Sequence, residues 1–199
     1  MSTRIILVRH ATCAQMDSML LGRTIDPPLD RRGESQAQAL AEHFSSLAQL
    51  WLEASPRRRA QQTAAAIASR RGSEVSTAME MDEVDFGHWS GRSFALLAED
   101  PRWREWNERR SQSRTPAGER ISMVQRRAME YLQSLARTHT GETAAIVTHA
   151  EIIRSVVLAC LGASIDNYSQ IEIAPASLTT LSMNAAQLRL ERYNERIVA

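Results

Sequence analysis

The sequence predicts an α/β fold in one domain, built around a mostly parallel sheet. The chain has 199 residues and is 43% hydrophobic, which is enough to bury one sizeable core. Two apolar runs, Ile5–Val8 and Thr143–Val147, have the composition of strands that are buried on both faces of a parallel sheet. Each run ends at polar residues and is followed along the chain by a helical pattern, which is the alternation typical of α/β proteins.

The segment after the first strand predicts an amphipathic helix. It follows a loop that contains Gly22, Pro27 and Pro28, and Asp30 is a suitable N-cap. Apolar side chains then recur at helical spacing and define one buried face. They are Ala37, Leu40, Ala41, Phe44, Leu47 and Ala48.

A second strand and helix follow directly. Leu50–Ala54 has the pattern of a short strand, and Ser55 with Pro56 supplies an N-cap and a first-turn proline behind it. These signals place Arg59 within the first turns of the next helix, which we expect to end near Gly72.

The chain between residues 80 and 120 has a different character. Glu74–Met79 is expected to form a short strand before it. The segment itself is rich in Arg, Glu and Ser, contains three tryptophans, and is interrupted by Pro101, Pro116 and Gly118. We therefore predict short helices in a lid or insert at about residues 80–120, within a single domain that spans residues 1–199.

The last third of the chain predicts another strand-helix unit and then strands. A long helix begins near Ile121 and closes near Gly141, and the Thr143–Val147 strand is followed by a helix that includes Ile152–Cys160. Three further runs alternate as strands do, the last two joined by a hairpin turn at residues 184–186. These runs are Gln170–Ala174, Leu178–Met183 and Leu188–Tyr193.

Composition excludes several classes of protein. The formal net charge is +1, from 24 basic and 23 acidic residues, so no global field favours nucleic acid or an anionic membrane. Cys13 and Cys160 are the only cysteines, which excludes a disulfide framework and a cysteine-only zinc site. No apolar run is long enough for a signal peptide or a membrane span. We expect a cytoplasmic protein with reduced thiols.

Three strand-helix junctions carry the residues that point to chemistry. His10 follows the first strand, Arg59 follows the second, and His149 follows the strand before the last long helix. Because ligands of parallel α/β sheets bind at the carboxyl ends of the strands, these side chains converge if their strands are neighbours. Together with Arg9 and the amides of helix N-termini, they make a site for a dianionic phosphoryl group.

The residue types suit phosphoryl transfer. Arginine binds two phosphoryl oxygens through its planar fork, and neutral imidazole is a competent nucleophile near pH 7. The leaving oxygen also needs an acid, and Glu83 is the candidate, with Asp82 and Asp85 beside it as alternatives. Arg58 is the substitute if Arg59 lies elsewhere. The arginines and histidines supply the charge, so we expect neither a metal nor a cofactor.

Several motifs in one order give the chain a family resemblance. The run at Leu7–Thr12 resembles the arginine-histidine-glycine signature of the histidine phosphatase superfamily, also called the phosphoglycerate mutase-like family. Four further blocks are similar to that family's pattern over nearly the whole chain. They are Gly22–Leu29 with Gly33 and Gln36-Ala37, Ser55–Ala64, Glu83–Gly91, and Val147–Ala150 with Ile153-Arg154.

The resemblance implies a fold and a set of roles. The expected fold is a three-layer α/β/α sandwich, with a phosphohistidine at His10 and with Glu83 acting first as acid and then as base for water. Arg9, Arg59 and His149 would hold the phosphoryl group. The residues expected to contact substrate are Arg9, His10, Arg59, His149, Thr12, Met16, Arg23 and Ala150.

Near the first motif the chain departs from the family pattern. Ala11 and Thr12 replace the usual glycine and its acidic or polar neighbour, and Met16 aligns with a common asparagine. Met16 removes a polar contact to the substrate. The phosphoryl pocket is therefore the shared feature, and the rest of the substrate pocket is particular to this chain.

The expected function is hydrolysis of a small phosphorylated metabolite, as in the phosphatase branch that includes α-ribazole phosphatase. Phosphoglycerate mutase activity is the first alternative, although the chain lacks the longer insert and the asparagine-rich stretch usual in mutases. A phosphoprotein or signalling module that docks a partner through the arginine-rich lid is the second. We expect a monomer or homodimer that binds neither nucleic acid nor membrane.

Overall fold

The computed structural model describes residues 2–184 and 187–197, and their strands form one sheet with helices on both faces. Strand order is β3-β2-β4-β1-β5-β6. The strands are β1 (Thr3–Arg9), β2 (Trp51–Ala54), β3 (Ser76–Thr77), β4 (Thr143–Thr148), β5 (Ser177–Asn184) and β6 (Gln187–Arg196). Pairing is parallel from β3 to β1 and antiparallel at β5 and β6. The expected mostly parallel α/β sheet is confirmed.

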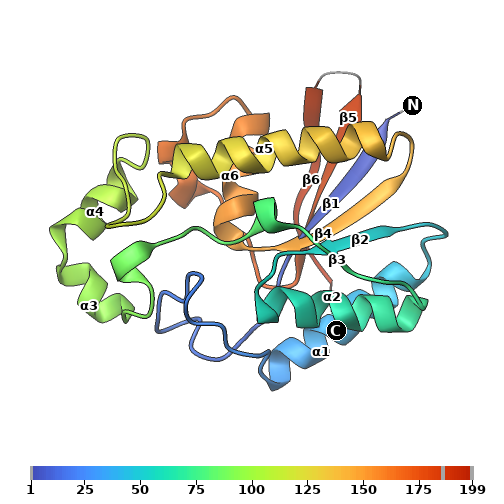
Figure 1. The fold of residues 1–199 in the computed structure, drawn as a ribbon, viewed down its shortest axis with the longest axis horizontal. Coiled ribbons are helices and arrows are strands. Elements are labelled where there is room, and N and C mark those ends of the chain that lie inside the picture. Colours follow the sequence, from blue (N-terminus) through green and yellow to red (C-terminus); the bar gives the residue numbers. More distant parts are fainter. Residues whose placement is uncertain (1, 185–186, 198–199) are drawn as a thin grey trace.

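Helices cover the sheet on both faces and complete three layers (Figure 1). The α-helices are α1 (Arg31–Ser45), α2 (Arg58–Arg71), α3 (Phe94–Glu99), α4 (Pro101–Glu108), α5 (Ile121–Thr138) and α6 (Ala150–Cys160). Helices α1 and α2 pack together under one face, and α5 and α6 pack on the other. None of the helices in the described residues is long and apolar enough to cross a membrane.

The alternation of side chains along β1 divides the core in two. Ile5 and Leu7 pack in the cluster under α5 and α6, whereas Ile6 and Val8 pack in the cluster under α1 and α2. All four are almost fully buried. Since successive side chains of a strand point to opposite faces, an unbroken apolar run is what a strand between two helical layers requires.

The segment between β3 and α5 extends the apolar cluster that contains Ile5 and Leu7. Short 3₁₀ helices at Met79–Met81 and Gly87–Trp89 precede α3 and α4, as the expectation of short helices required. The ring of Trp89 packs edge-on against Trp103 at 5.2 Å and against Trp106 at 6.1 Å between centroids. Figure 1 shows this segment extending beyond one end of the sheet.

Several predicted boundaries in the first half of the chain are wrong. The first helix ends at Ser45, before Leu47 and Ala48. Helix α2 begins at Arg58 with Arg57 at its N-cap, so Ser55 does not cap it and Pro56 lies outside its first turn. The reason is that the Ser55 hydroxyl is bound by His149 instead. Only Ser76–Thr77 of the predicted Glu74–Met79 strand forms one.

The predicted strand at Gln170–Ala174 is also wrong. The chain there leaves a 3₁₀ helix, Ile165–Gln170, and continues without strand pairing. Side chains bind backbone groups of this segment in place of a neighbouring strand. The carbonyl of Ile171 accepts a hydrogen bond from Arg154, and the carbonyl of Ile173 accepts one from Arg9. The other two predicted strands are β5 and β6, which pair as an antiparallel hairpin. Ala185 and Ala186 of the predicted turn lie outside the described residues.

Candidate active site

Two parallel neighbouring strands bring His10 and His149 together. Arg9 of β1 lies opposite Thr148 of β4, so the next residue of each strand stands at the same edge of the sheet. The two imidazole centroids are 5.2 Å apart. Strand β2 pairs with the other side of β4, and α2 after it supplies Arg59. The condition on which the predicted convergence depended, that these strands are neighbours, is therefore met.

The hydrogen bonds of His10 define its tautomer. Its Nδ1 lies 2.8 Å from the carbonyl oxygen of Ala11, and its Nε2 lies 3.3 Å from the Nε–H of Arg59. A carbonyl only accepts and a guanidinium only donates, so Nδ1 carries the proton and Nε2 presents its lone pair. Burial and the charges of Arg59 and Arg9 hold the pKa of His10 well below its usual value. His10 is thus neutral near pH 7, with a lone pair on Nε2.

The same reasoning orients His149, which is fully buried. Its Nδ1 accepts from Arg59 at 3.3 Å, so its Nε2 carries the proton and donates to the Ser55 hydroxyl at 2.7 Å. Burial, followed by the charge of Arg59, keeps the pKa of His149 well below its usual value. Ser55 thereby fixes the ring from behind.

Arg59 is the group that joins the two imidazoles. Its side chain is 1% exposed, although no strong carboxylate partner balances it, the nearest being Asp26 at 3.4 Å. One Nη donates to the carbonyl of Gly22 at 3.0 Å, which fixes the guanidinium between β1 and β4. Burying a cation in this way is costly without an anion, so the geometry is suited to a ligand that brings negative charge.

Glu83 lies at the edge of the same site. Its Oε2 is 3.6 Å from Nδ1 of His149, and its Oε1 accepts from the backbone N–H of Val84 at 2.9 Å. Burial raises the pKa of Glu83 to about 7, against an opposing effect of Arg59. The carboxyl group can therefore both give and take a proton near neutral pH.

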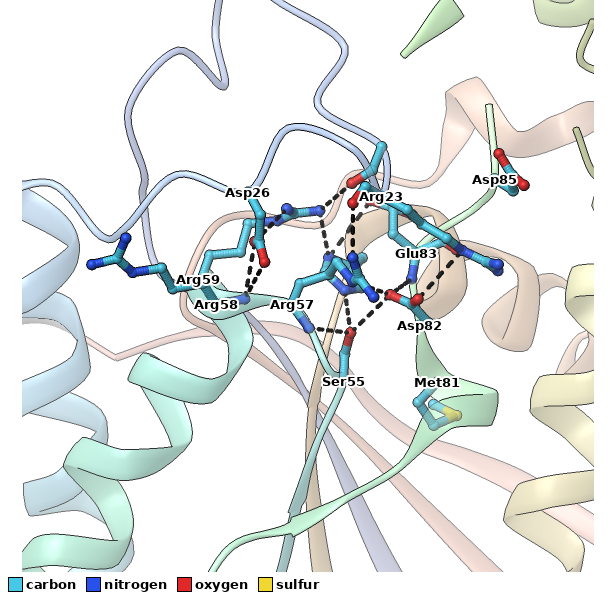
Figure 2. Close-up of polar contacts among 12 residues, drawn as sticks. Arg23, Asp26, Ser55, Arg57, Arg58, Arg59, Met81, Asp82, Glu83 and Asp85 are labelled. Carbon is cyan, nitrogen blue, oxygen red and sulfur yellow. Dashed lines mark hydrogen bonds and ion pairs between the residues drawn. The ribbon is translucent and has the colours of Figure 1, made fainter. Parts of the chain in front are cut away.

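The neighbouring acids serve other contacts. Asp82 is buried and accepts from the Glu83 backbone N–H at 2.8 Å, while it forms ion pairs with Arg57 at 2.9 Å and Arg23 at 3.4 Å (Figure 2). Asp85 accepts from the backbone N–H of Gly87 at 2.9 Å. A cavity opens beside His10 and Arg59, and neither Asp82 nor Asp85 lines it. Of the three acids, the structure therefore brings only Glu83 to this cavity.

A cavity of about 250 Å³ opens over these residues. Of the expected site residues, the structure brings Arg9, His10, Arg59, Glu83, Met16 and Ala150 to its walls. His149 lies behind the wall, in contact with Arg59. Arg9 donates to the carbonyl of Ile173 at 2.5 Å, and both burial and the charge of Arg154 lower its pKa.

Thr12, Arg23 and Arg58 lie outside the cavity wall. The Thr12 hydroxyl donates to Asp30 at 2.8 Å and so joins the loop after His10 to the N-cap of α1. Arg23 donates to the backbone carbonyl of Glu83 at 2.7 Å and thereby helps to hold the backbone that carries this acid. Arg58 is exposed and only its backbone N–H reaches Asp26, as Figure 2 shows.

The far wall of the cavity contains a charged cluster that the sequence reasoning missed. Arg110, from the lid, is 3% exposed and pairs with Glu151, which also accepts from Arg154 at 2.9 Å. The guanidinium carbon of Arg110 stands 3.2 Å from the ring centroid of Tyr168. Two features of the sequence could have indicated this cluster, the arginine-rich lid and the Ile153-Arg154 pair. No pattern in the sequence showed that these two segments lie in contact.

Known proteins share the sequence pattern and the fold of this chain. The sequence profile of the histidine phosphatase superfamily (branch 1) matches residues 5–196. Phosphoserine phosphatase 1 of Hydrogenobacter thermophilus is 28% identical over 182 residues, which are 90% of this chain and 86% of that protein. The native structure of mycobacterial glucosyl-3-phosphoglycerate phosphatase is 25% identical, with a TM-score of 0.86 over 98% of this chain and 100% of that chain. A mutant phosphoserine phosphatase of Entamoeba histolytica, solved with phosphoserine, is 24% identical and has the same fold, with a TM-score of 0.87 over 96% of each chain.

Proposed function

Because this chain belongs to branch 1 of the histidine phosphatase superfamily, we propose that it hydrolyses a small phosphorylated metabolite through a phosphohistidine on His10. The names of its relatives support a phosphatase, since both phosphoserine phosphatase and glucosyl-3-phosphoglycerate phosphatase act on small phosphate esters. One observation carries the proposal. The Nε2 lone pair of a neutral, buried His10 faces the cavity that also holds Arg9, Arg59 and Glu83.

Substrate binding places the phosphoryl group against the guanidinium groups of Arg9 and Arg59. Each planar fork binds two equatorial oxygens. The incoming dianion also supplies negative charge to balance the buried guanidinium of Arg59. As the Arg59 Nε–H turns to the phosphoryl oxygens, Nε2 of His10 loses its hydrogen bond and gains a free lone pair. The pair of arginines thereby neutralises the substrate and releases the nucleophile in one step.

In the first chemical step, Nε2 of His10 attacks phosphorus and the bond from phosphorus to the ester oxygen breaks. The leaving oxygen takes the proton of Glu83, which burial keeps partly protonated near pH 7. The Nδ1–H of His10 stays hydrogen-bonded to the carbonyl of Ala11 and holds the ring in line. Transition-state charge on the equatorial oxygens is stabilised by Arg9 and Arg59, with His149 supporting Arg59 from behind.

In the second step, the Glu83 carboxylate takes a proton from water as the water oxygen attacks phosphorus. The bond from phosphorus to nitrogen breaks, its electron pair returns to Nε2 of His10, and inorganic phosphate leaves. Glu83 is protonated again and the site is ready for the next turnover. The charges in this scheme come from arginines, so the proposal requires neither a metal nor a cofactor.

A panel of phosphorylated metabolites tests the activity. Purified protein should release inorganic phosphate from at least one small ester, and His10→Ala should abolish that release. Including 3-phosphoglycerate as an acceptor separates hydrolysis from mutase activity, because a mutase transfers the phosphoryl group to it instead of to water. Equal turnover by His10→Ala, or transfer only to phosphoglycerate, would contradict the proposal.

The remaining expectations are part of the same proposal. Residues 1–199 act as one domain, with residues 80–120 as a lid whose Trp103, Asn107 and Arg110 line the active-site cavity. We propose a cytoplasmic enzyme, monomeric or homodimeric, that acts on small molecules. Light scattering measures the mass of the assembly and so distinguishes a monomer from a homodimer. A dilution series shows whether the catalytic parameters depend on that assembly.

A further inference from the structure

A second cavity lies next to the active site and shares two of its arginines. Its volume is about 640 Å³, and Arg9 and Arg154 line both cavities. The start of α1, the segment at residues 172–176 and the end of β6 form its other walls. We call it the arginine groove and define it by its polar residues, which are Arg9, Arg32, Ser35, Gln36, Arg154, Glu172 and Arg196.

The arginine groove has an excess of positive charge. Four guanidinium groups line it against one carboxylate, Glu172, which pairs with Arg196 at 2.7 Å on the exposed rim. Arg154 shares Glu151 with Arg110. In the part of the chain that the structure describes, no carboxylate lies within 4.0 Å of Arg9 or Arg32. The chain as a whole has a net charge of only +1, so this excess is local.

Two of these cations are held in place although they repel each other. The Nε–H of Arg154 donates to the carbonyl of Ile171 at 2.7 Å, and Arg9 donates to the carbonyl of Ile173. The charge of Arg154 is one cause of the lowered pKa of Arg9. The Nε of Arg9 is buried and has no hydrogen-bond partner among the described residues. Guanidinium groups that are already fixed by such hydrogen bonds need little reorganisation to bind an oxyanion.

We propose that the arginine groove binds a second phosphate group, at a site distinct from that of the phosphate that His10 attacks. Phosphate fits better than a single carboxylate because its two charges match the excess and its oxygens accept from several guanidinium groups at once. The volume of the groove, about 640 Å³, is sufficient for inorganic phosphate or a small phosphate ester. The site needs no turnover at His10, so it does not rest on the proposed hydrolysis.

The shared arginines couple the two sites. A phosphate in the arginine groove lowers the positive potential at Arg9 and Arg154, which also face the active-site cavity. Substrate then binds more weakly while the groove is occupied. Inorganic phosphate, the expected product, is therefore predicted to inhibit the enzyme by binding at two sites. The groove site can be removed by changing Arg32 and Arg196, which do not line the active-site cavity.

A phosphate titration of the full chain, followed by the NMR signals of the arginine Nε–H groups, tests the second site. Ionic strength is kept constant with chloride. We expect saturable shifts at Arg32 and Arg196 in addition to those at Arg59, which reports the active site. The variant Arg32→Gln/Arg196→Gln should lose the saturable shift of the Gln36 side-chain amide, which lines only the groove, and keep the Arg59 response. Its thermal unfolding should match the wild type because both substituted side chains are exposed.

Two matched variants complete the test. Arg31→Gln/Arg192→Gln changes exposed arginines of α1 and β6 that lie outside the arginine groove, and it should keep both responses. Arg59→Ala should lose active-site binding and keep the shifts at Arg32 and Arg196. No saturable shift at those two arginines, an unchanged Gln36 amide response in the groove variant, or loss of the groove response in Arg59→Ala would overturn the proposal. An absence of phosphatase activity would leave each of these readouts unaffected.

Discussion

Oε2 of Glu83 lies 3.6 Å from Nδ1 of His149, the same nitrogen that accepts from Arg59. Because that lone pair is used by the guanidinium, the imidazole stays neutral and offers no positive charge to the carboxylate. Burial then dominates and raises the pKa of Glu83 to about 7. The arrangement leaves a carboxyl group that exchanges its proton close to neutral pH, in the same site as an imidazole, His10, that stays neutral.

The pH profile of kcat/KM should report this arrangement. With an alkyl phosphate, activity should fall above about pH 7, because the protonated form of Glu83 is then lost. The acid limb should lie below the usual histidine range, since burial lowers the pKa of His10. In Glu83→Gln the alkaline limb near pH 7 should vanish. An unchanged alkaline limb in Glu83→Gln would show that a group other than Glu83 causes the fall in activity.

The leaving group should decide how much Glu83→Gln costs. General acid catalysis contributes typically about 10²–10⁴-fold, so the variant should slow an alkyl phosphate by that order. A nitrophenyl ester needs little protonation and should phosphorylate His10 almost as fast as in the wild type. Water activation would still be impaired, so a burst followed by slow turnover is expected in stopped-flow measurements. Equal slowing of both esters would count against the acid role.

The covalent intermediate should be trapped on His10. Rapid quench with labelled substrate is expected to give an adduct that acid destroys and base preserves. Mass spectrometry of the base-stable peptide should place the phosphoryl group on His10, and His149→Ala should retain the ability to form it at a reduced rate. A label on any other side chain would remove His10 from the nucleophilic role.

Glu83 should also make stability depend on pH. Its folded pKa, about 7, is above the ordinary 4.5, so the folded protein holds the proton more tightly than the unfolded chain does. That contribution is fully present below about pH 4.5 and is lost as the pH rises through 7. The unfolding free energy of Glu83→Gln, relative to wild type, should therefore rise by roughly 3 kcal/mol between these limits. Urea titrations across the range measure it, and a flat difference would contradict the raised pKa.

Asp82 should matter as a positioning residue. Its carboxylate holds the backbone N–H of Glu83 and pairs with Arg57, so Asp82→Asn should lower stability by about 1–3 kcal/mol and slow turnover. The alkaline limb set by Glu83 should shift, which a purely structural loss would not produce. Asp17→Asn, an exposed change on the same protein, is the control and should leave both quantities unaltered.

The sequence carried the information for the strands and the phosphoryl site because both are locally encoded. Ile5–Val8 is apolar at every position, as a strand between two helical layers must be, and the residue after it reaches the sheet edge whatever the loops do. His10 and His149 therefore needed only the pairing of β1 with β4. The family resemblance supplied the order of the motifs.

The errors came from contacts between distant segments. Ser55 has the local features of an N-cap, but its hydroxyl is bound by His149, 94 residues further along the chain. The Gln170–Ala174 run alternates like a strand, but Arg9 and Arg154 take its carbonyls. Likewise, the contact of Arg110 with Tyr168 joins the lid to the segment after α6, and no local pattern in either segment indicates it.

The buried pairing of Arg110 with Glu151 has a consequence for warm conditions. Hydration of charged groups becomes less favourable as temperature rises, so the cost of burying an ion pair falls while the gain from apolar burial levels off. The lid is held to α6 by this pair, whereas its tryptophan rings pack against one another within the lid. Heating should therefore loosen the aromatic packing of the lid before it loosens the far wall of the cavity, so the part of the lid around Arg110 should be the last to lose its shape.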